Sequence, residues 1–180
     1  MRQDLRLHPD SRCDALSGID LDIARMRPAG LVVRFAAQGR TSDVVCPPAQ
    51  TNARADGLWR STCFEIFLRA PSETGYCEFN FSPSTEWAAY GFSKYREGMR
   101  DLAIAAPAIA VTSNDSELAL QVEIDLRGVP DLSSDSHWRL GLSAVIEETN
   151  GRISYWALRH PPGKPDFHHP DCFALELPPP

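Results

Sequence analysis

Hydrophobic residues in this chain recur at every second position, in short runs that turn-forming residues interrupt. The clearest run is ELALQVEIDL at 117–126, where leucine, valine and isoleucine alternate with Glu, Ala, Gln and Asp. A period of two is typical of a β-strand that buries one face, whereas an amphipathic helix repeats every three to four residues. No long amphipathic helix is visible, so the alternation favours an all-β fold.

Similar runs follow one another closely, with Pro, Gly, Asn, Asp and Ser between them. They lie at 19–26, 30–39, 62–70, 76–82, 87–95, 117–126, 138–148, 152–160 and 172–177. The first two read as a hairpin, and 138–148 pairs with 152–160 across Asn-Gly, which suits a type I′ turn. Roughly nine or ten strands predict one domain, 1–180, folded as a jelly-roll-like β-sandwich of two antiparallel sheets with little or no helix.

Two longer connections separate the predicted strands. The segment 46–57 is the longest loop, and 96–107 is predicted to hold either a short helix or an irregular crossover.

Charge and cysteine content narrow the class of partner. The chain of 180 residues carries a net charge of −6, which disfavours nucleic acid and anionic membranes. Its five cysteines form no C-x-x-C pair, so neither a disulfide framework nor a zinc ribbon is indicated. No signal-peptide pattern or long apolar run is present, and we expect a cytoplasmic protein, although a removed export signal would leave no trace. The oligomeric state is not predicted.

The central runs give a register from their turn lengths. We expect 65 to face 80 and 67 to face 78, and then 80 to face 89 and 78 to face 91. One sheet face would then carry Glu65, Glu78, Asn80, Trp87, Ala89 and Gly91. The opposite face would form the core with Phe64, Ile66, Leu68, Phe79, Phe81, Tyr90 and Phe92. Gln121, Glu123 and Asp125 are expected to extend a similar polar surface.

Two interpretations of this polar face remain open. It is either the solvated outside of a sandwich or a ligand-binding surface, and a tryptophan beside small residues favours the second. Aromatic rings that stack on a sugar, together with carboxylates and amides that accept its hydroxyl protons, suit carbohydrate recognition.

Three blocks, GLWRSTCFEIFL (57–68), YCEFNFSPS (76–84) and 153–177, resemble the family-nine carbohydrate-binding modules and the wider DOMON-like group of β-sandwiches. The most specific piece is formed by Trp59, Glu65, Ile66 and Phe67. The resemblance implies non-catalytic binding of a sugar between two aromatic side chains, here Trp59 and Phe167. The family has a tryptophan at the position of Phe167 and a basic residue at that of Glu78.

From these observations we predict a site for a carbohydrate or similar small polar ligand. Trp59 and Phe167 are the stacking walls, Trp87 flanks them, and the polar contacts are Glu65, Glu78, Asn80, Arg96, Arg159 and His160. Prolines stiffen the loop that carries Phe167. Arg96 is alternatively the partner of a carboxylate across the sheet.

Other chemistries use some of the same residues. Asp166 and His168 are weak candidates for a metal site, although adjacent side chains in an extended segment point to opposite sides. The resemblance also allows a structural calcium, with 112–117 as one acidic loop, or a haem held by Met26 or Met99 with His160. A carboxylate-based enzyme would use Glu65 and Glu78 as acid and base, but no catalytic motif is legible.

Overall fold

The computed structural model describes residues 1–129 and 132–180. In that part of the chain there are twelve strands, three short 3-10 helices and no α-helix, which confirms the all-β class. The strands are β1 (Arg2–Leu7), β2 (Leu16–Met26), β3 (Gly30–Gly39), β4 (Cys63–Arg69), β5 (Tyr76–Phe81), β6 (Trp87–Phe92), β7 (Arg100–Asp101), β8 (Ala108–Ser113), β9 (Glu117–Asp125), β10 (Trp138–Glu147), β11 (Ile153–Ala157) and β12 (Leu175–Leu177). The 3-10 helices are η1 (Thr41–Asp43), η2 (Leu58–Arg60) and η3 (Pro170–Cys172).

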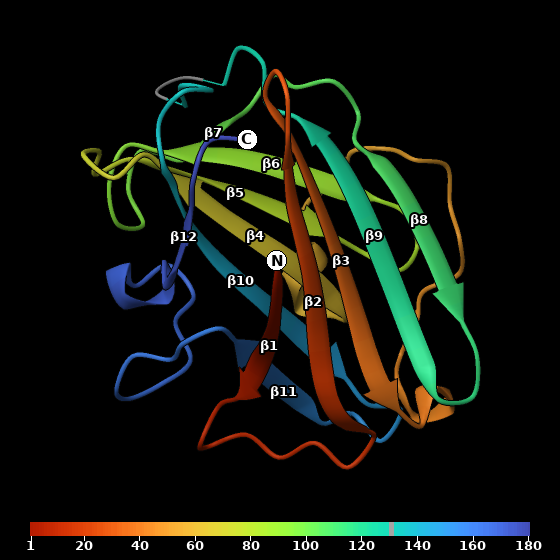
Figure 1. The fold of residues 1–180 in the computed structure, drawn as a ribbon. Coiled ribbons are helices and arrows are strands. Elements are labelled where there is room, and N and C mark those ends of the chain that lie inside the picture. Colours follow the sequence, from red (N-terminus) through yellow and green to blue (C-terminus); the bar gives the residue numbers. More distant parts are fainter. Residues whose placement is uncertain (130–131) are drawn as a thin grey trace.

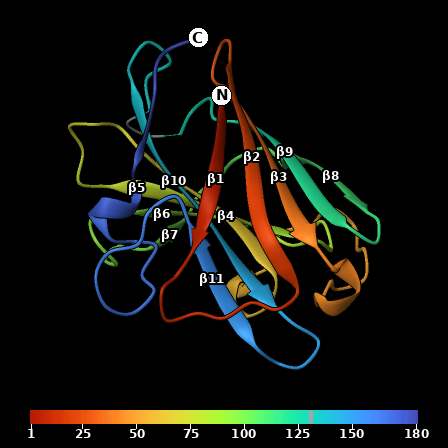
Figure 2. The same ribbon diagram turned by 60° about the horizontal axis from the view of Figure 1, so that its bottom comes forward.

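The strands form one curled antiparallel sheet with the order β7-β6-β5-β4-β10-β11-β1-β2-β3-β9-β8, and β12 also pairs with β10. Figures 1 and 2 show how this sheet folds over itself into a sandwich-like shape. We call β1, β2, β3, β9 and β8 layer A, and β4 to β7, β10, β11 and β12 layer B. Because β1 pairs with β2 on one edge and with β11 on the other, it joins the layers, and two separate jelly-roll sheets are not seen.

The main hydrophobic core lies between the two layers. It contains the inward-facing residues of both layers, and Phe35 of β3 meets Phe64 of β4 with ring centroids 5.1 Å apart. Burial along β2 alternates almost perfectly, as the sequence pattern predicts for a strand with one face in water. No helix in the described residues has the length and apolar composition needed to span a membrane.

The predicted hairpins are present, with one change of turn type. β2 pairs with β3, and β10 pairs with β11 from Glu147 opposite Ile153. The type I′ turn is wrong, because only Gly151 has a positive φ there, 83°, and Asn150 does not. The segment 96–107 is the irregular crossover, with β7 as its only regular element in the described structure.

The register of the central strands was predicted correctly for one pair and wrongly for the next. Glu65 lies opposite Asn80, as expected. Asn80, however, lies opposite Ala88 rather than Ala89. The reason is the turn: Ser82 N–H bonds the Glu86 carbonyl oxygen at 3.0 Å, and Thr85 takes a φ of 72°, so three residues rather than four close it. One residue of slip exchanges the two faces of β6.

Candidate functional site

The outer surface of layer B, on the side away from the main core, brings together most of the predicted polar residues. One row of neighbours crosses five strands there, running from Ala88 through Asn80, Glu65 and Ser143 to Ala157. All five side chains are buried. We call Asn80, Glu65 and Ser143 the polar row; the alanines at its two ends occupy little space above the sheet.

The hydrogen bonds within this surface leave one buried acceptor atom unpaired among the described residues. The Asn80 Nδ2 amide donates to Glu78 Oε1 at 2.8 Å, and the Ser143 hydroxyl donates to Glu65 Oε2 at 3.2 Å. The Asn80 Oδ1 atom is buried and accepts no hydrogen bond from the described residues. Because an unpaired buried acceptor costs free energy, Asn80 is available for a ligand's donor group.

Burial sets the protonation of the two carboxyl groups. Desolvation, with a smaller contribution from the charge of Glu78, raises the pKa of Glu65 to about 8. Desolvation also raises the pKa of Glu78, against the opposing effects of the Asn80 hydrogen bond and the Arg96 charge. Near neutral pH Glu65 is therefore mainly protonated, and the surface presents a hydroxyl donor as well as acceptors.

Residues 158–174 cross this surface, and we call them the strap. The His168 ring packs edge-on against Phe67 with centroids 5.1 Å apart, and its Nδ1 lies 2.8 Å from the Tyr76 hydroxyl. Desolvation is the main cause that lowers the pKa of His168 to about 4, so the ring is neutral at pH 7. The Cys172 carbonyl oxygen lies so close to Gly141 that an added Cβ would be 2.9 Å from it.

Asp166 fixes the strap to the loop after β6. Its carboxylate accepts hydrogen bonds from Arg96 Nη2 at 2.7 Å and from the Tyr95 hydroxyl at 2.5 Å, and also from the His168 amide at 3.2 Å. Arg96 thus pairs with the strap rather than with Glu65 or Glu78. These contacts account for Asp166 and His168 without a metal, and the described residues contain no group of three or more side chains suited to hold one.

The two tryptophans predicted at the site lie in different environments. Trp59 belongs to η2, which packs against β4 and β5, and the residue is 52% exposed. Its neighbour Leu58 contacts the hydrophobic residues on the outer surface of layer B. Trp87, by contrast, is buried in the main core as a consequence of the register shift, with the Arg54 guanidinium 5.5 Å from its ring. It does not flank the polar row.

Phe167 lies on the strap but offers little free ring surface. It is 9% exposed and packs against Tyr155 and His160, at centroid distances of 6.1 and 6.4 Å. Tyr90 and Phe92, expected in the main core, instead join Phe67, Tyr76, Phe167 and Phe173 in a second hydrophobic cluster on this surface. Phe167 is therefore a wall of that cluster, and stacking on it requires the strap to shift.

Arg159 and His160 sit at the base of the strap, beyond the Ala157 end of the polar row. The His160 Nε2 atom is 2.8 Å from the Arg6 carbonyl oxygen, and burial is the main cause that lowers the pKa of this histidine. Arg159 is exposed and borders a separate hollow between β1 and β12. Neither residue contacts the polar row through a hydrogen bond in the described structure.

The remaining cofactor candidates are spread over the fold. Met26 ends β2 and Met99 lies in the loop between β6 and β7, both exposed, while His160 uses Nε2 for the Arg6 carbonyl. In the loop 112–117, Asn114 Oδ1 accepts the backbone N–H groups of Ser116 and Glu117 and so closes the turn itself. These placements do not favour a haem or calcium site there.

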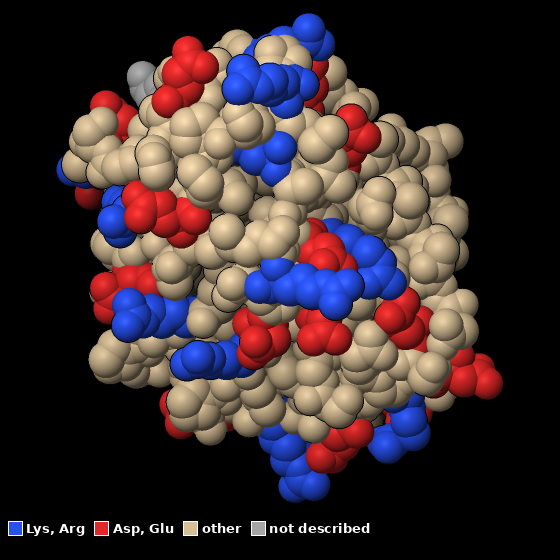
Figure 3. All heavy atoms as spheres, in the orientation of Figure 1, with Lys and Arg blue, Asp and Glu red and all other residues tan. Residues whose placement is uncertain are grey.

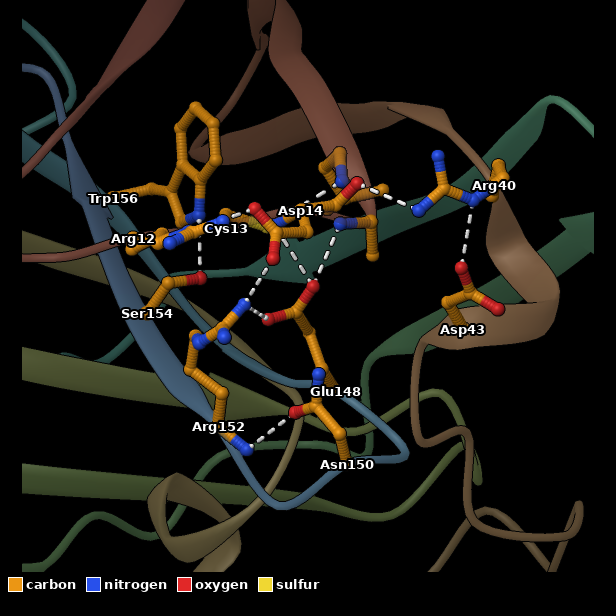
Figure 4. Close-up of polar contacts among 12 residues, drawn as sticks. Arg12, Cys13, Asp14, Arg40, Asp43, Glu148, Asn150, Arg152, Ser154 and Trp156 are labelled. Atoms are coloured by element: carbon orange, nitrogen blue, oxygen red, sulfur yellow. Dashed lines mark hydrogen bonds and ion pairs between the residues drawn. The ribbon is translucent and has the colours of Figure 1, made fainter.

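A third buried acidic residue, Glu148, has hydrogen-bond partners for both of its carboxylate oxygens. It accepts the N–H groups of Asp14 and Ala15 at 2.9 and 2.7 Å and pairs with Arg152 at 3.2 Å (Figure 4). The cluster ties the loop after β1 to the turn between β10 and β11. We assign it a structural role, because its hydrogen bonds hold chain segments together.

Some residues on the outer surface of layer B were not predicted as site residues. Ser143 interrupts an otherwise apolar run, and this interruption was the available signal. Tyr90 donates its hydroxyl proton to Asp56 at 2.5 Å, a contact between a strand and the long loop before η2. No local pattern indicates that pairing, because it depends on how the loop returns to the sheet.

Comparisons with known proteins identify the fold. No protein-family model and no curated protein matches the chain. Among solved structures, a Bacteroides uniformis protein described as a "putative carbohydrate-binding protein" aligns with a TM-score of 0.69 and 12% identity, over 95% of this chain and 83% of that one. A family-nine carbohydrate-binding module from Caldicellulosiruptor kristjanssonii, in complex with glucose, aligns with a TM-score of 0.52 and 8% identity, over 86% and 72%. The chain has the fold of these carbohydrate-binding modules.

Proposed function

We propose that this protein binds a carbohydrate, or a similar small polar ligand, without transforming it. The proposed site is the polar row, with Trp59 on one side and the strap on the other. The observation that carries the proposal is the buried polar row itself, because Asn80 Oδ1 has no partner among the described residues and Glu65 is kept mainly protonated. Hydroxyl groups of a sugar both donate and accept, which matches this set of atoms.

The structural neighbours support the same class of ligand. The Caldicellulosiruptor kristjanssonii module is described in complex with glucose and, in a second structure that aligns with a TM-score of 0.50 and 10% identity, with cellotriose. In the proposed complex the exposed Trp59 ring stacks on a sugar face. Phe167 completes the site after the strap shifts, and Arg96 reaches the ligand from the strap side.

A non-catalytic role is favoured by the structural neighbours, which are described as carbohydrate-binding. Retaining and inverting glycosidases both use one ionised carboxylate beside one protonated acid. Burial raises the pKa of both Glu65 and Glu78, and the charge of Glu78 adds to the shift of Glu65, so these two residues are the pair that an enzymatic role would use. We expect no hydrolysis of chromogenic glycosides. Hydrolysis that disappears in Glu65→Gln would replace the binding proposal with an enzymatic one.

Tryptophan fluorescence tests the proposal directly. All four tryptophans lie in the described residues, and Trp59 is exposed while Trp87, Trp138 and Trp156 are buried. Iodide quenching therefore reports mainly on Trp59. We expect glucose or cello-oligosaccharides to protect this residue saturably, and Trp59→Ala to weaken the affinity measured by calorimetry about tenfold or more.

Two control variants make the result specific. Trp59→Phe keeps an aromatic face and should retain most of the affinity, whereas Met99→Ala changes an exposed side chain outside the proposed site and should retain all of it. A panel of mono- and oligosaccharides that gives neither protection nor heat with folded protein would refute the sugar site.

A further inference from the structure

A hollow lies where β1 leaves layer B to join layer A. Arg6 of β1 pairs with Ala157 of β11, whereas residues 2–5 pair with β2. β12 meanwhile continues along the free edge of β10 from Leu140 to Trp138. The strands β1 and β12 therefore diverge, and the space between them is about 340 Å³. This volume is within the range of small-molecule sites, roughly 300–1,000 Å³.

Two arginines border this hollow from opposite sides. Gln3, Asp4 and Arg6 line it from β1, and Leu158, Arg159 and residues 174–175 line it from the strap and β12. Arg6 and Arg159 are both exposed, and within the described residues neither guanidinium makes a hydrogen bond or an ion pair. Asp4 also lines the hollow but forms no ion pair with either of them, so the lining keeps one net positive charge.

This state differs from that of two other arginines in layer A. Arg2 on the same strand pairs with Asp22 at 3.1 Å, and Arg34 on β3 pairs with Glu117 at 2.6 Å. In a chain of net charge −6, carboxylates are plentiful enough to pair most arginines. Two unpaired guanidinium groups around one hollow therefore form a local positive site on a negative protein.

The backbone segments that carry the arginines are held together. The His8 amide donates to the Tyr155 carbonyl oxygen at 2.8 Å, and His160 Nε2 lies 2.8 Å from the Arg6 carbonyl oxygen. β1 and the base of the strap are thus joined beside the hollow. Fixing both segments before binding lowers the entropy that a ligand would otherwise lose.

We propose that this hollow binds a small anionic metabolite through a carboxylate or phosphate group held by Arg6 and Arg159. A guanidinium is planar and matches the two oxygens of either group with paired hydrogen bonds. Gln3 supplies an amide donor, and Leu158 and Leu175 provide apolar contact for a carbon skeleton. The lining includes neither Trp59 nor any residue of the polar row, and the two proposed sites share only the base of the strap.

The test is a titration followed by two-dimensional NMR of backbone amides, with inorganic phosphate and with citrate at constant ionic strength. We expect saturable shifts at residues 3–6, 158–159 and 174–175. The anion with the higher affinity identifies the preferred group, phosphate or carboxylate. Arg6→Gln and Arg159→Gln should each weaken binding about tenfold, as expected for loss of a charge-assisted hydrogen bond.

Matched variants separate this site from nonspecific charge effects and from the sugar site. Lys164→Gln removes one exposed positive charge from the strap outside the hollow and should leave the affinity unchanged. Arg159→Lys keeps the charge without the planar fork and should bind with intermediate affinity. Trp59→Ala should bind the anion like the wild type. Shifts that do not saturate, that map elsewhere, or that persist unchanged in Arg6→Gln and Arg159→Gln would overturn the proposal.

Discussion

The outer faces of the two layers are built from similar strands but meet different surroundings. In layer A, β2 alternates between buried and exposed residues from Ile19 to Met26, and basic and acidic side chains are interspersed on the surface (Figure 3). In layer B, every residue of β5 and β6 is buried, on both faces of the sheet. The strap and η2 cover the outer face of layer B, while the outer face of layer A lies in water.

The difference shows where a polar side chain is hydrated and where its burial is unfavourable for folding. On layer A, Gln121 and Glu123 are exposed on β9, so they form a polar surface in contact with solvent that is separate from the buried polar row of layer B. On layer B, Asn80 and Glu65 are buried, and their polar atoms are incompletely paired. Sequences rarely keep such groups without a structural or functional reason, because burial without a partner is unfavourable. Glu148 has the structural reason, whereas Asn80 Oδ1 of the polar row has no partner among the described residues.

The largest effect is expected from a substitution that tests whether the outer face of layer B forms a second hydrophobic core. Phe67 is 1% exposed and contacts the second hydrophobic cluster. We expect Phe67→Ala to lower the free energy of unfolding by about 3–5 kcal/mol, measured by urea denaturation. Gln121→Ala, on the exposed face of layer A, should change it by less than about 0.5 kcal/mol. Equal effects at the two positions would mean that the strap does not bury this face.

The second-largest expected effect is a dependence of folding stability on pH. The pKa of Glu65 is raised from 4.5 to about 8, so the folded state holds this proton more tightly than the unfolded state. The contribution of Glu65 to stability is full below pH 4.5 and is lost as pH rises toward 8. Glu65→Gln should remove this loss and be more stable than wild type at pH 8, by on the order of a few kcal/mol.

Thermal or urea unfolding at pH 5 and pH 8 measures that difference. Glu123→Gln on layer A is the matched control, because its side chain is exposed. It should change the stability little at either pH. A Glu65→Gln variant that tracks the wild type across this range would mean that Glu65 is hydrated.

The smallest effect concerns the contact between strap and sheet. In Gly141→Ala, the new Cβ would lie 2.9 Å from the Cys172 carbonyl oxygen, so the strap must move away. We expect a loss of about 1–3 kcal/mol and faster amide hydrogen exchange at residues 166–173. Gly18→Ala on β2 is the control, because nothing lies within 4 Å of its added Cβ. Unchanged exchange in Gly141→Ala would mean that the strap does not rest on β10.

Much of the fold could be predicted because alternation marks strands with one wet face. β2, β3 and β9 show that pattern, and their positions agree with the sequence. The strands β1, β7 and β8 were missed, since RQDLRL at 2–7 is mostly polar and β7 has two residues. The register of β6 could not be predicted, because it depends on the left-handed conformation of Thr85.

The candidate site was predictable in part. Glu65, Glu78 and Asn80 share a face, since their register follows from the hairpin between β4 and β5. Trp87 lies on the other face because of the slip in β6. The arrangement of the strap, with Asp166 bound to Arg96 and Phe167 turned inward, depends on contacts between segments that are distant in sequence. Local patterns carry no information about such contacts.

The position of β1 also has a kinetic consequence. Its pairing with β11 joins residues near opposite ends of the chain, and this seam connects the two layers. Contacts between distant residues form slowly, because a long loop must close before they contribute stability. We therefore expect each layer to gain structure from its own hairpins first, and the seam to close late. The proposed anion site, which lies along that seam, would then be among the last parts of the molecule to form.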